Sequence, residues 1–322
     1  MEKYMGNPSQ VYGVEEHRLV GGKGDNMRLF QVRNGKGLEF TVSADRCADI
    51  SRLSFRGYNF GFFAPCGYVA PQYYDNKEAN FLKSFTAGFF TTCGFGNVGS
   101  PCNDDGEELP LHGNISNVPA EQISAWEDGK AIHIAAIIRD ASLFGTKYTL
   151  KREYTCPLDE NVIYLTDTVT NSGGEKVPFL MLYHCNMAYP LLCEQSHIRI
   201  DSKSIKARTQ NAQDAIDDYL KMEEPQRGFE EQCFFFEMER GFAGIFNKQI
   251  GAGISVEFNP DELPCFTEWK MMGEGEYVLG LEPGNCFPTG RSEIKKEGRL
   301  GYLMPGESKT HHLTFRIHEE DF

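Results

Sequence analysis

Hydrophobic and polar residues alternate with a period of two along much of this chain. The alternation is clearest in six segments, at residues 36–42, 131–138, 146–154, 161–171, 254–258 and 310–318. Successive side chains of an extended strand point to opposite faces, so this pattern is typical of strands with one buried face. Turn-forming pairs such as Asn34-Gly35 and Asp128-Gly129 separate the strands. The pattern predicts an all-β protein.

Helical periodicity is scarce. It is confined to residues 75–85 and 210–222, each with capping residues near its start. Residues 60–115 are rich in Gly, Phe and Cys and are predicted to form long loops over one face of the sheet, where loops often line sites. No proline-rich linker, charge block or repeat divides the chain. We therefore expect one domain spanning residues 1–322.

Composition narrows the class of partner. With 40% hydrophobic and 12% aromatic residues, a chain of 322 residues can bury a large core. Its formal net charge of −14 repels phosphate backbones and anionic lipids, so neither a nucleic acid nor a membrane is expected as partner. The first eight residues lack the basic start and apolar stretch of a signal peptide, which predicts a cytoplasmic location. The ten cysteines form no Cys-x-x-Cys pair and are interpreted as reduced, mostly structural thiols.

Three ionisable residues stand in apolar, strand-like surroundings. Glu282 follows the apolar run 277–281, His184 follows 179–183, and His112 lies in the sequence Leu-His-Gly. Each alone is more often structural, but a carboxylate with two imidazoles is suited to giving and taking protons near neutral pH. The same three groups could form a metal triad. Such sites usually hold two ligands on one strand as His-x-Asp/Glu, a spacing that these residues lack, so no metal ligand is predicted.

A set of segments, taken in order, resembles the galactose mutarotase (aldose 1-epimerase) superfamily, and in particular its bacterial aldose 1-epimerase-like branch. These segments are residues 45–50, 91–94, 111–113, 183–192, 280–285 and 290–291, which extend over nearly the whole chain. The resemblance implies a galactose mutarotase-like β-supersandwich with few short helices and a shallow sugar cleft on one face. It also implies an isomerase that needs no cofactor and opens and closes an aldose ring at its anomeric carbon.

The same resemblance assigns roles to the three residues. His184 would give a proton to the ring oxygen, Glu282 would take one from the anomeric hydroxyl, and His112 would hydrogen-bond near the ring oxygen. Asn186 lies two residues after His184, so it points to the same side of an extended strand and is expected to orient the imidazole or bind a hydroxyl.

Further positions are candidates for binding the sugar. Glu231 falls where the family holds sugar hydroxyls with an acidic residue, although the adjacent Glu230 leaves the register open. Trp269 is a candidate for stacking on a sugar face, with packing in the core as the alternative. The basic residues Arg46, Lys270 and Arg291 are candidates for binding an anionic substituent, with structural ion pairing as the alternative.

One segment departs from the better-studied galactose mutarotases. Those proteins carry an Asn-Arg pair that contacts the sugar, whereas the corresponding stretch here is Thr91-Thr92-Cys93-Gly94, which makes Thr92 a candidate binding residue. We therefore expect the substrate to be an aldose or aldose derivative other than plain galactose. Two alternatives stay open, a non-catalytic carbohydrate sensor on the same fold and, less favoured, a metal-dependent sugar isomerase.

Overall fold

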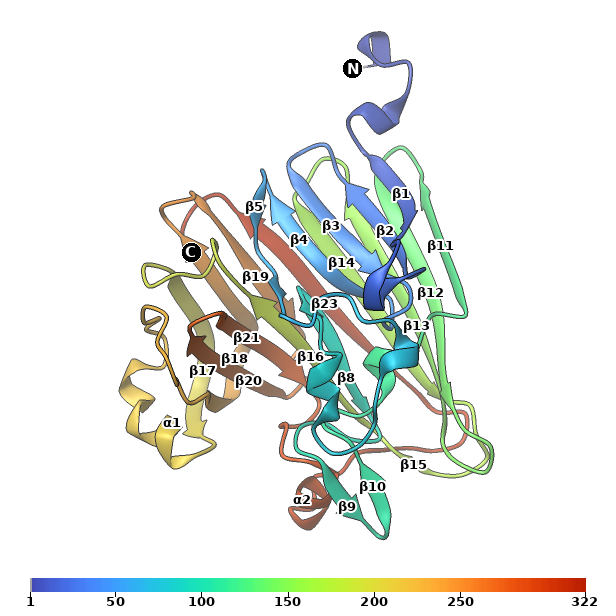
Figure 1. The fold of residues 1–322 in the computed structure, drawn as a ribbon, viewed down its shortest axis with the longest axis vertical. Coiled ribbons are helices and arrows are strands. Elements are labelled where there is room, and N and C mark those ends of the chain that lie inside the picture. The colour runs from blue at the N-terminus through green and yellow to red at the C-terminus, as the bar shows by residue number, and fades with distance from the viewer. Residues whose placement is uncertain (1) are drawn as a thin grey trace.

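The computed structural model describes residues 2–322 and is built mainly from two antiparallel sheets (Figure 1). The smaller sheet has five strands in sequence order: β1 (Gly13–Arg18), β2 (Arg28–Arg33), β3 (Leu38–Ser43), β4 (Asp49–Phe55) and β5 (Tyr58–Asn59).

The larger sheet has twelve strands in the order β11-β12-β13-β14-β23-β19-β18-β20-β21-β16-β8, with β17 paired to β18. The bounds are β8 (Phe90–Phe95), β11 (Gln122–Glu127), β12 (Ala131–Ala141), β13 (Lys147–Pro157), β14 (Val162–Asn171), β16 (Leu180–Met187), β17 (His197–Ala207), β18 (Gln232–Asn247), β19 (Ala252–Phe258), β20 (Cys265–Gly273), β21 (Glu276–Gly284) and β23 (Ser308–His318).

Short elements complete the chain. Three two-stranded pairs join β6 (Phe62–Phe63) to β7 (Ala87–Gly88), β9 (Cys102–Asp104) to β10 (Glu107–Leu109), and β15 (Val177–Pro178) to β22 (Tyr302–Leu303). The α-helices are α1 (Gln210–Asp214) and α2 (Arg291–Lys296). The 3-10 turns are Glu2–Tyr4, Pro8–Gln10, Gly22–Gly24, Pro71–Tyr73, Asn80–Lys83, Ile115–Asn117 and Ile216–Asp218.

The strand predictions are confirmed. All six alternating segments lie in strands, namely β3, β12, β13, β14, β19 and β23. Buried residues alternate along β13 and β14, and their apolar side chains join those of the smaller sheet in one continuous core. Figure 1 shows the smaller sheet lying over β12, β13 and β14. Apolar burial between these two layers is the main contribution to stability.

A buried ion-pair network also joins the two layers. Arg152 on β13 is fully buried and donates two hydrogen bonds to Asp167 on β14, of 2.9 and 2.6 Å. It also donates to Asp49 on β4 of the other sheet, and to Thr92 on β8 at 2.7 Å. Charge-assisted bonds of this kind compensate the desolvation of both carboxylates.

The predicted helices are shorter than expected. The segment 210–222 forms only α1 and the 3-10 turn Ile216–Asp218, and 75–85 forms only the turn Asn80–Lys83. In the second segment Glu78 has a φ of 48°, and its carbonyl accepts a hydrogen bond from the Leu111 N–H. A residue in this left-handed conformation cannot continue a right-handed helix, so the prediction for 75–85 was wrong.

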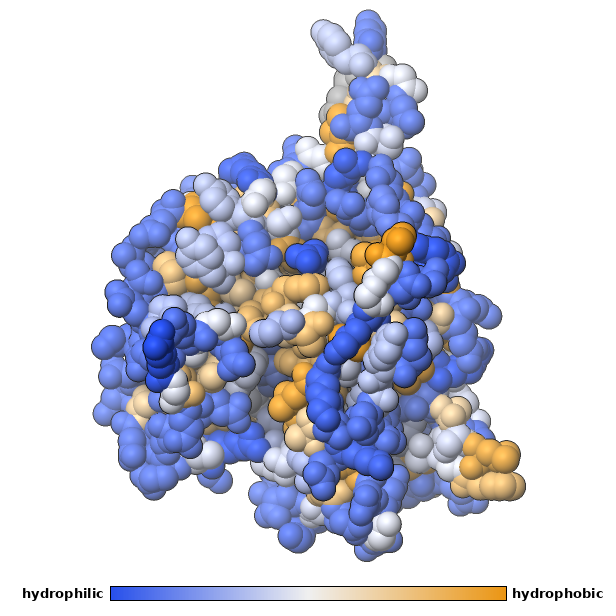
Figure 2. Space-filling view, in the orientation of Figure 1, coloured by the Kyte–Doolittle hydropathy of each residue, from blue (hydrophilic) through white to orange (hydrophobic). Residues whose placement is uncertain are grey.

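The long loops predicted for residues 60–115 contain one strand of the large sheet. Strand β8 pairs with β16 at the edge of that sheet, and short turns and hairpins surround it. Figure 2 shows a largely hydrophilic face with apolar side chains gathered near its middle, beside β8 and β16. The candidate site lies in this region, where apolar and polar side chains meet.

Candidate active site

His184 and Glu282 face each other across two neighbouring strands. Strand β16 pairs antiparallel with β21, and the partners Leu182↔Gly284 and Cys185↔Leu281 place residue 184 opposite residue 282. Nε2 of His184 lies 3.2 Å from Oε1 of Glu282. Both side chains are almost fully buried, with 6% and 2% exposed. Directly opposed residues share one face of a sheet, which explains the close approach.

Asn186 sets the tautomer of His184. Its Nδ2 donates to the His184 carbonyl at 2.8 Å, so its Oδ1 must be the atom that lies 2.7 Å from Nδ1 of the ring. An amide oxygen only accepts, so Nδ1 carries a hydrogen. In the neutral ring Nε2 is then the basic nitrogen, and it is the one that faces Glu282. Burial lowers the pKa of His184 to about 4, with the Asn186 hydrogen bond acting in the opposite direction.

One carboxylate oxygen of Glu282 is left without a hydrogen bond in the described part of the chain. Within residues 2–322, its Oε1 accepts no hydrogen bond. Burial raises its pKa well above 4.5, Glu231 raises it further, and Arg208 lowers it. The carboxylate is accommodated over Gly280, where an added Cβ would stand 2.3 Å from Oε1. Burial therefore favours the neutral form of both groups, in which Nε2 of His184 is unprotonated and the Glu282 carboxyl carries the one proton of the pair.

His112 reaches the site from a loop. It has a φ of 58°, and its ring centroid lies 5.5 Å from that of His184. The Gly99 N–H donates to Nδ1 of His112 at 3.3 Å, so in the neutral ring Nε2 carries the hydrogen. Burial and the neighbouring His184 lower the pKa of His112 well below 6.5. This imidazole is thus a neutral hydrogen-bond donor.

His184, Glu282 and His112 line a cavity of about 260 Å³, whereas Asn186 lies behind His184 and is not part of its wall. Trp269 and Glu231 form part of its wall, and Nε1 of Trp269 donates to Oε2 of Glu231 at 2.8 Å. Glu231 rather than Glu230 lines the cavity. The wall also contains Phe81, Leu82, Phe85, Gly99, Ser100, Leu111, Arg208, Cys233, Thr267 and Pro288. Aromatic side chains with a few convergent polar groups are typical of a site for a small polar molecule.

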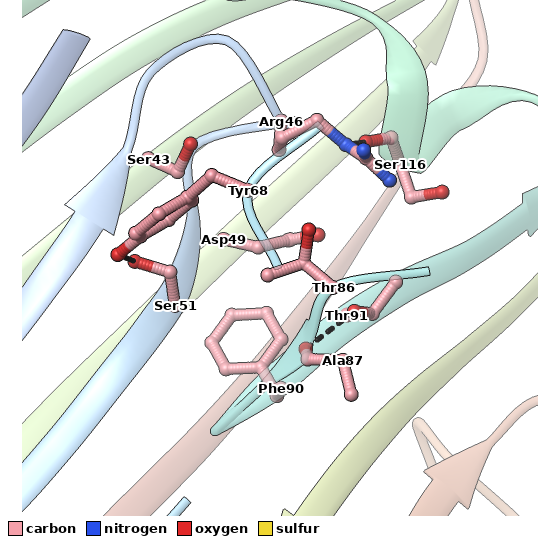
Figure 3. Close-up of a pocket in the computed structure, with 10 residues that line it drawn as sticks. All are labelled: Ser43, Arg46, Asp49, Ser51, Tyr68, Thr86, Ala87, Phe90, Thr91 and Ser116. Atoms are coloured by element: carbon pink, nitrogen blue, oxygen red, sulfur yellow. Dashed lines mark hydrogen bonds between the residues drawn. The ribbon is translucent and has the colours of Figure 1, made fainter. Parts of the chain in front are cut away.

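Two candidate binding residues lie in a different place. Figure 3 shows Arg46 among the residues that line a second, smaller pocket. This pocket has a volume of about 20 Å³ and shares no lining residue with the cavity. Its guanidinium donates to the carbonyls of Ser116, Val69 and Ser84 at 2.7 to 2.8 Å. Thr92 is fully buried and hydrogen-bonds to Asp49 at 2.6 Å. Both residues are engaged inside the protein and do not line the cavity.

The other two basic candidates form ion pairs. Lys270 is fully buried, and its Nζ lies 2.9 Å from Glu223. It alternates with Trp269 along β20, so it points to the opposite face of the sheet. Arg291 lies at the start of α2 and pairs with Asp104 at 2.8 Å and with Glu107 at 2.5 Å. Structural ion pairing, the alternative that the sequence left open, describes both residues.

Sequence reasoning missed three residues of this site. Thr267 is paired with Glu282 across β20 and β21, and its buried Oγ1 has no hydrogen-bond partner among residues 2–322. Arg208 reaches the cavity from the end of β17, and Gly280 lies under the Glu282 carboxylate. Gly280 lies two residues before Glu282 on the same face, a spacing that could have identified it. Thr267 and Arg208 carry no local signal.

Residues 2–322 contain no group of three or more His, Cys, Asp or Glu side chains arranged to hold a metal ion. Within the same range, none of the helices is both long and apolar enough to cross a bilayer.

Comparisons with known proteins agree with the architecture. A family model described as a domain of unknown function, DUF4432, matches residues 24–317. No curated protein matches the sequence. A provisionally named aldose 1-epimerase from Klebsiella pneumoniae has a similar structure, with a TM-score of 0.89 and 23% identity over 97% of this chain and 86% of that chain.

Two further solved structures are similar. A galactose mutarotase-like protein from Clostridium acetobutylicum has a TM-score of 0.68 and 14% identity over 96% of this chain and 99% of that chain. A provisionally named aldose 1-epimerase from Escherichia coli K12 has a TM-score of 0.58 and 18% identity over 95% and 99%. At these identities the likeness shows the fold. The predicted galactose mutarotase-like β-supersandwich is therefore confirmed.

Proposed function

This chain belongs to the DUF4432 family, and we propose that it is an aldose 1-epimerase-type isomerase that interconverts the anomers of a sugar. The observation that carries the proposal is the pair formed by His184 and Glu282. Their facing atoms lie 3.2 Å apart, and both almost fully buried side chains line the cavity. Provisionally named aldose 1-epimerases among the structural neighbours support the same reaction class.

The chemistry follows from the one proton that the pair holds. When this proton moves from Glu282 to Nε2 of His184, the pair becomes an imidazolium and a carboxylate. His184 then gives this proton to the ring oxygen while Glu282 takes the proton of the anomeric hydroxyl, so the bond from the anomeric carbon to the ring oxygen breaks and an aldehyde forms. After rotation of the aldehyde, the reverse transfers close the ring on its other face and restore both groups. No proton is gained or lost overall.

The surrounding residues have supporting roles in this proposal. Asn186 holds the Nδ1 hydrogen of His184, which keeps Nε2 directed at the reacting oxygens. The neutral His112 donates from Nε2 to a sugar oxygen. Trp269 presents an aromatic surface for a sugar face, and Glu231 accepts from sugar hydroxyls beside it.

The test is anomer exchange measured by magnetisation-transfer NMR on a panel of neutral, acidic and phosphorylated aldoses. His184→Ala and Glu282→Gln are each expected to lower the exchange rate roughly a hundredfold to ten-thousandfold, the usual worth of a positioned proton-transfer group. His197→Ala and Glu274→Gln, at exposed positions outside the cavity, are matched controls. Near-native exchange in either site variant would remove that residue from the mechanism.

The sensor alternative gives a different result. A carbohydrate sensor would bind a sugar with the same cavity but leave its anomer exchange at the spontaneous rate. Calorimetric binding of panel sugars, run beside the NMR measurement, separates the two functions. Binding without exchange in the unmodified protein would favour the sensor.

A further inference from the structure

We propose that the substrate carries an oxyanion, a carboxylate or a phosphate, and that Arg208 binds it in the cavity that His184 and Glu282 also line. This inference rests on the proposed function because it concerns the substrate of the same site. It differs from the expectation from sequence, which placed such a group near Arg46, Lys270 or Arg291.

Arg208 is the cation that lines the cavity in residues 2–322. Its Nη2 donates to Oγ of Ser100 at 2.9 Å, and its Nη1 lies 3.9 Å from Sγ of Cys233. Within the described chain it forms no ion pair with a carboxylate, in contrast to Lys270 and Arg291. A guanidinium has five donors in a planar fork, so most of this hydrogen-bonding capacity is left for a ligand.

The sheet register sets how far Arg208 lies from the reacting groups. Its N–H bonds to the Cys233 carbonyl at 3.0 Å, which continues the pairing of β17 with β18. From β17, the strands β18, β20 and β21 follow in order, so three strand spacings, roughly 14 Å, separate its backbone from that of Glu282. The long side chain covers part of this distance. An anion on Arg208 would therefore belong to a part of the sugar other than the anomeric carbon.

Nearby charges favour this location for an anion. The carboxylate of Glu231 lies on the Trp269 side of the cavity and is held by the indole N–H. Electrostatic repulsion from Glu231 would direct an anionic substituent away from that side. Arg208 lines the same cavity as Glu282 and His112, and its positive charge lowers the pKa of both groups. Arg208 is thus the position in the cavity where an oxyanion gains most.

A second hollow continues beyond Arg208. It has a volume of about 410 Å³ and is also lined by Lys206, which forms no ion pair within residues 2–322. Arg299 in the same wall pairs with Glu297, so Glu237 is the carboxylate there that lacks an ion pair in the described residues. Within the part of the chain that the structure describes, the wall of the hollow therefore has two cations without an ion pair, Arg208 and Lys206, and one such carboxylate. The whole chain has the opposite balance, with 46 acidic and 32 basic residues. The hollow gives the substituent room and a favourable potential.

The experiment compares matched sugars that differ only at the terminal carbon: glucose, glucuronate and glucose 6-phosphate, and the corresponding galactose series. Anomer exchange is measured at low and high salt for the unmodified protein, Arg208→Gln, Arg208→Lys and the control Arg227→Gln, whose side chain is 89% exposed. The carboxylate and phosphate arms show which oxyanion is preferred.

We expect the best anionic sugar to exceed its neutral counterpart at least about tenfold in kcat/KM at low salt, and less at high salt. Arg208→Gln should remove most of this preference, because it should raise KM about ten- to a hundredfold more for the anionic sugar than for the neutral one. Arg208→Lys should recover part of the loss, and Arg227→Gln should behave as the unmodified protein.

Equal or better turnover of the neutral sugars would overturn the proposal, as would an equal loss for both sugars in Arg208→Gln. Failure of the proposed function is distinguishable, because no panel sugar would then exchange its anomers in the unmodified protein. In that case, calorimetry with glucuronate and glucose 6-phosphate would test whether Arg208 binds an oxyanion. Binding weakened by Arg208→Gln would support it, and binding that is absent or unaffected by the substitution would overturn it.

Discussion

Gly280 provides the space that the Glu282 carboxylate occupies. A Cβ atom at residue 280 would stand 2.3 Å from Oε1 of Glu282 and 3.0 Å from Cβ of Trp269. The glycine and the glutamate share one face of β21, so the carboxylate folds back over the bare backbone towards the cavity. The position of the proposed base therefore depends on the absence of a side chain two residues earlier.

This relationship predicts the effect of Gly280→Ala. The new methyl group should displace the Glu282 carboxylate and lower kcat about ten- to a hundredfold, since misplacement by about 1 Å can cost that much. The measurement is anomer exchange together with thermal unfolding. Gly174→Ala is the control, because an added Cβ there meets no atom within 4 Å. Full activity of Gly280→Ala would show that the carboxylate position is unimportant.

Asn186 is predicted to act through the pKa and orientation of His184. In Asn186→Asp a carboxylate would face Nδ1, which favours the imidazolium and should raise the pKa of His184 from about 4. The acid limb of the pH profile should then move to higher pH. Asn186→Leu removes the Nδ1 partner and should lower kcat roughly tenfold or more. An unshifted profile in Asn186→Asp would contradict the orienting role.

The pH profile of the unmodified protein should be broad. Below about pH 4, Nε2 of His184 is protonated while Glu282 is protonated as well. Neither group can then accept a proton from the sugar, so activity falls. At high pH the pair loses its one proton, and because the pKa of Glu282 is raised well above 4.5, this limb lies far above that of an ordinary glutamate. Both limbs of the pH profile reflect the coupled titration of His184 and Glu282 rather than of either residue alone. The measurement is kcat/KM against pH, corrected for spontaneous exchange. An acid limb near pH 6.5 would contradict this prediction.

Arg152 is predicted to be important for stability. Arg152→Ala leaves Asp49 and Asp167 buried without their partner, and breaking a buried pair in this way costs about 3–5 kcal/mol. Arg28→Ala is the control, since it removes an ion pair with the exposed Glu16 and should cost less than about 1 kcal/mol. Urea denaturation measures both. Similar costs for the two variants would contradict the prediction.

Chelation should leave the anomer exchange intact. Proton transfer between sugar oxygens and the side chains of His184 and Glu282 requires no Lewis acid. The test is dialysis against a strong chelator followed by the NMR exchange measurement, with the protein dialysed against buffer alone as control. Activity that is lost on chelation and restored by one divalent cation would favour the metal-dependent sugar isomerase.

The sequence by itself determined the strands and their buried faces. Period-two alternation depends only on neighbours along the chain, so segments such as β13 and β14 were predictable from their own residues. The resemblance also singled out His184 and Glu282, because each lies in a recognisable segment. The shortened helix at 75–85 was beyond this reasoning, since the left-handed Glu78 is held by a hydrogen bond to the distant Leu111.

Tertiary structure alone decided which side chains meet. Lys270 and Trp269 are adjacent in sequence, yet one is buried against Glu223 while the other lines the cavity, and a shift of one residue in strand register would exchange them. Arg208 and Thr267 enter the site because β17, β18, β20, β21 and β16 are neighbours in the sheet. These pairings join residues far apart in sequence, and a local pattern of hydrophobic and polar positions does not specify them.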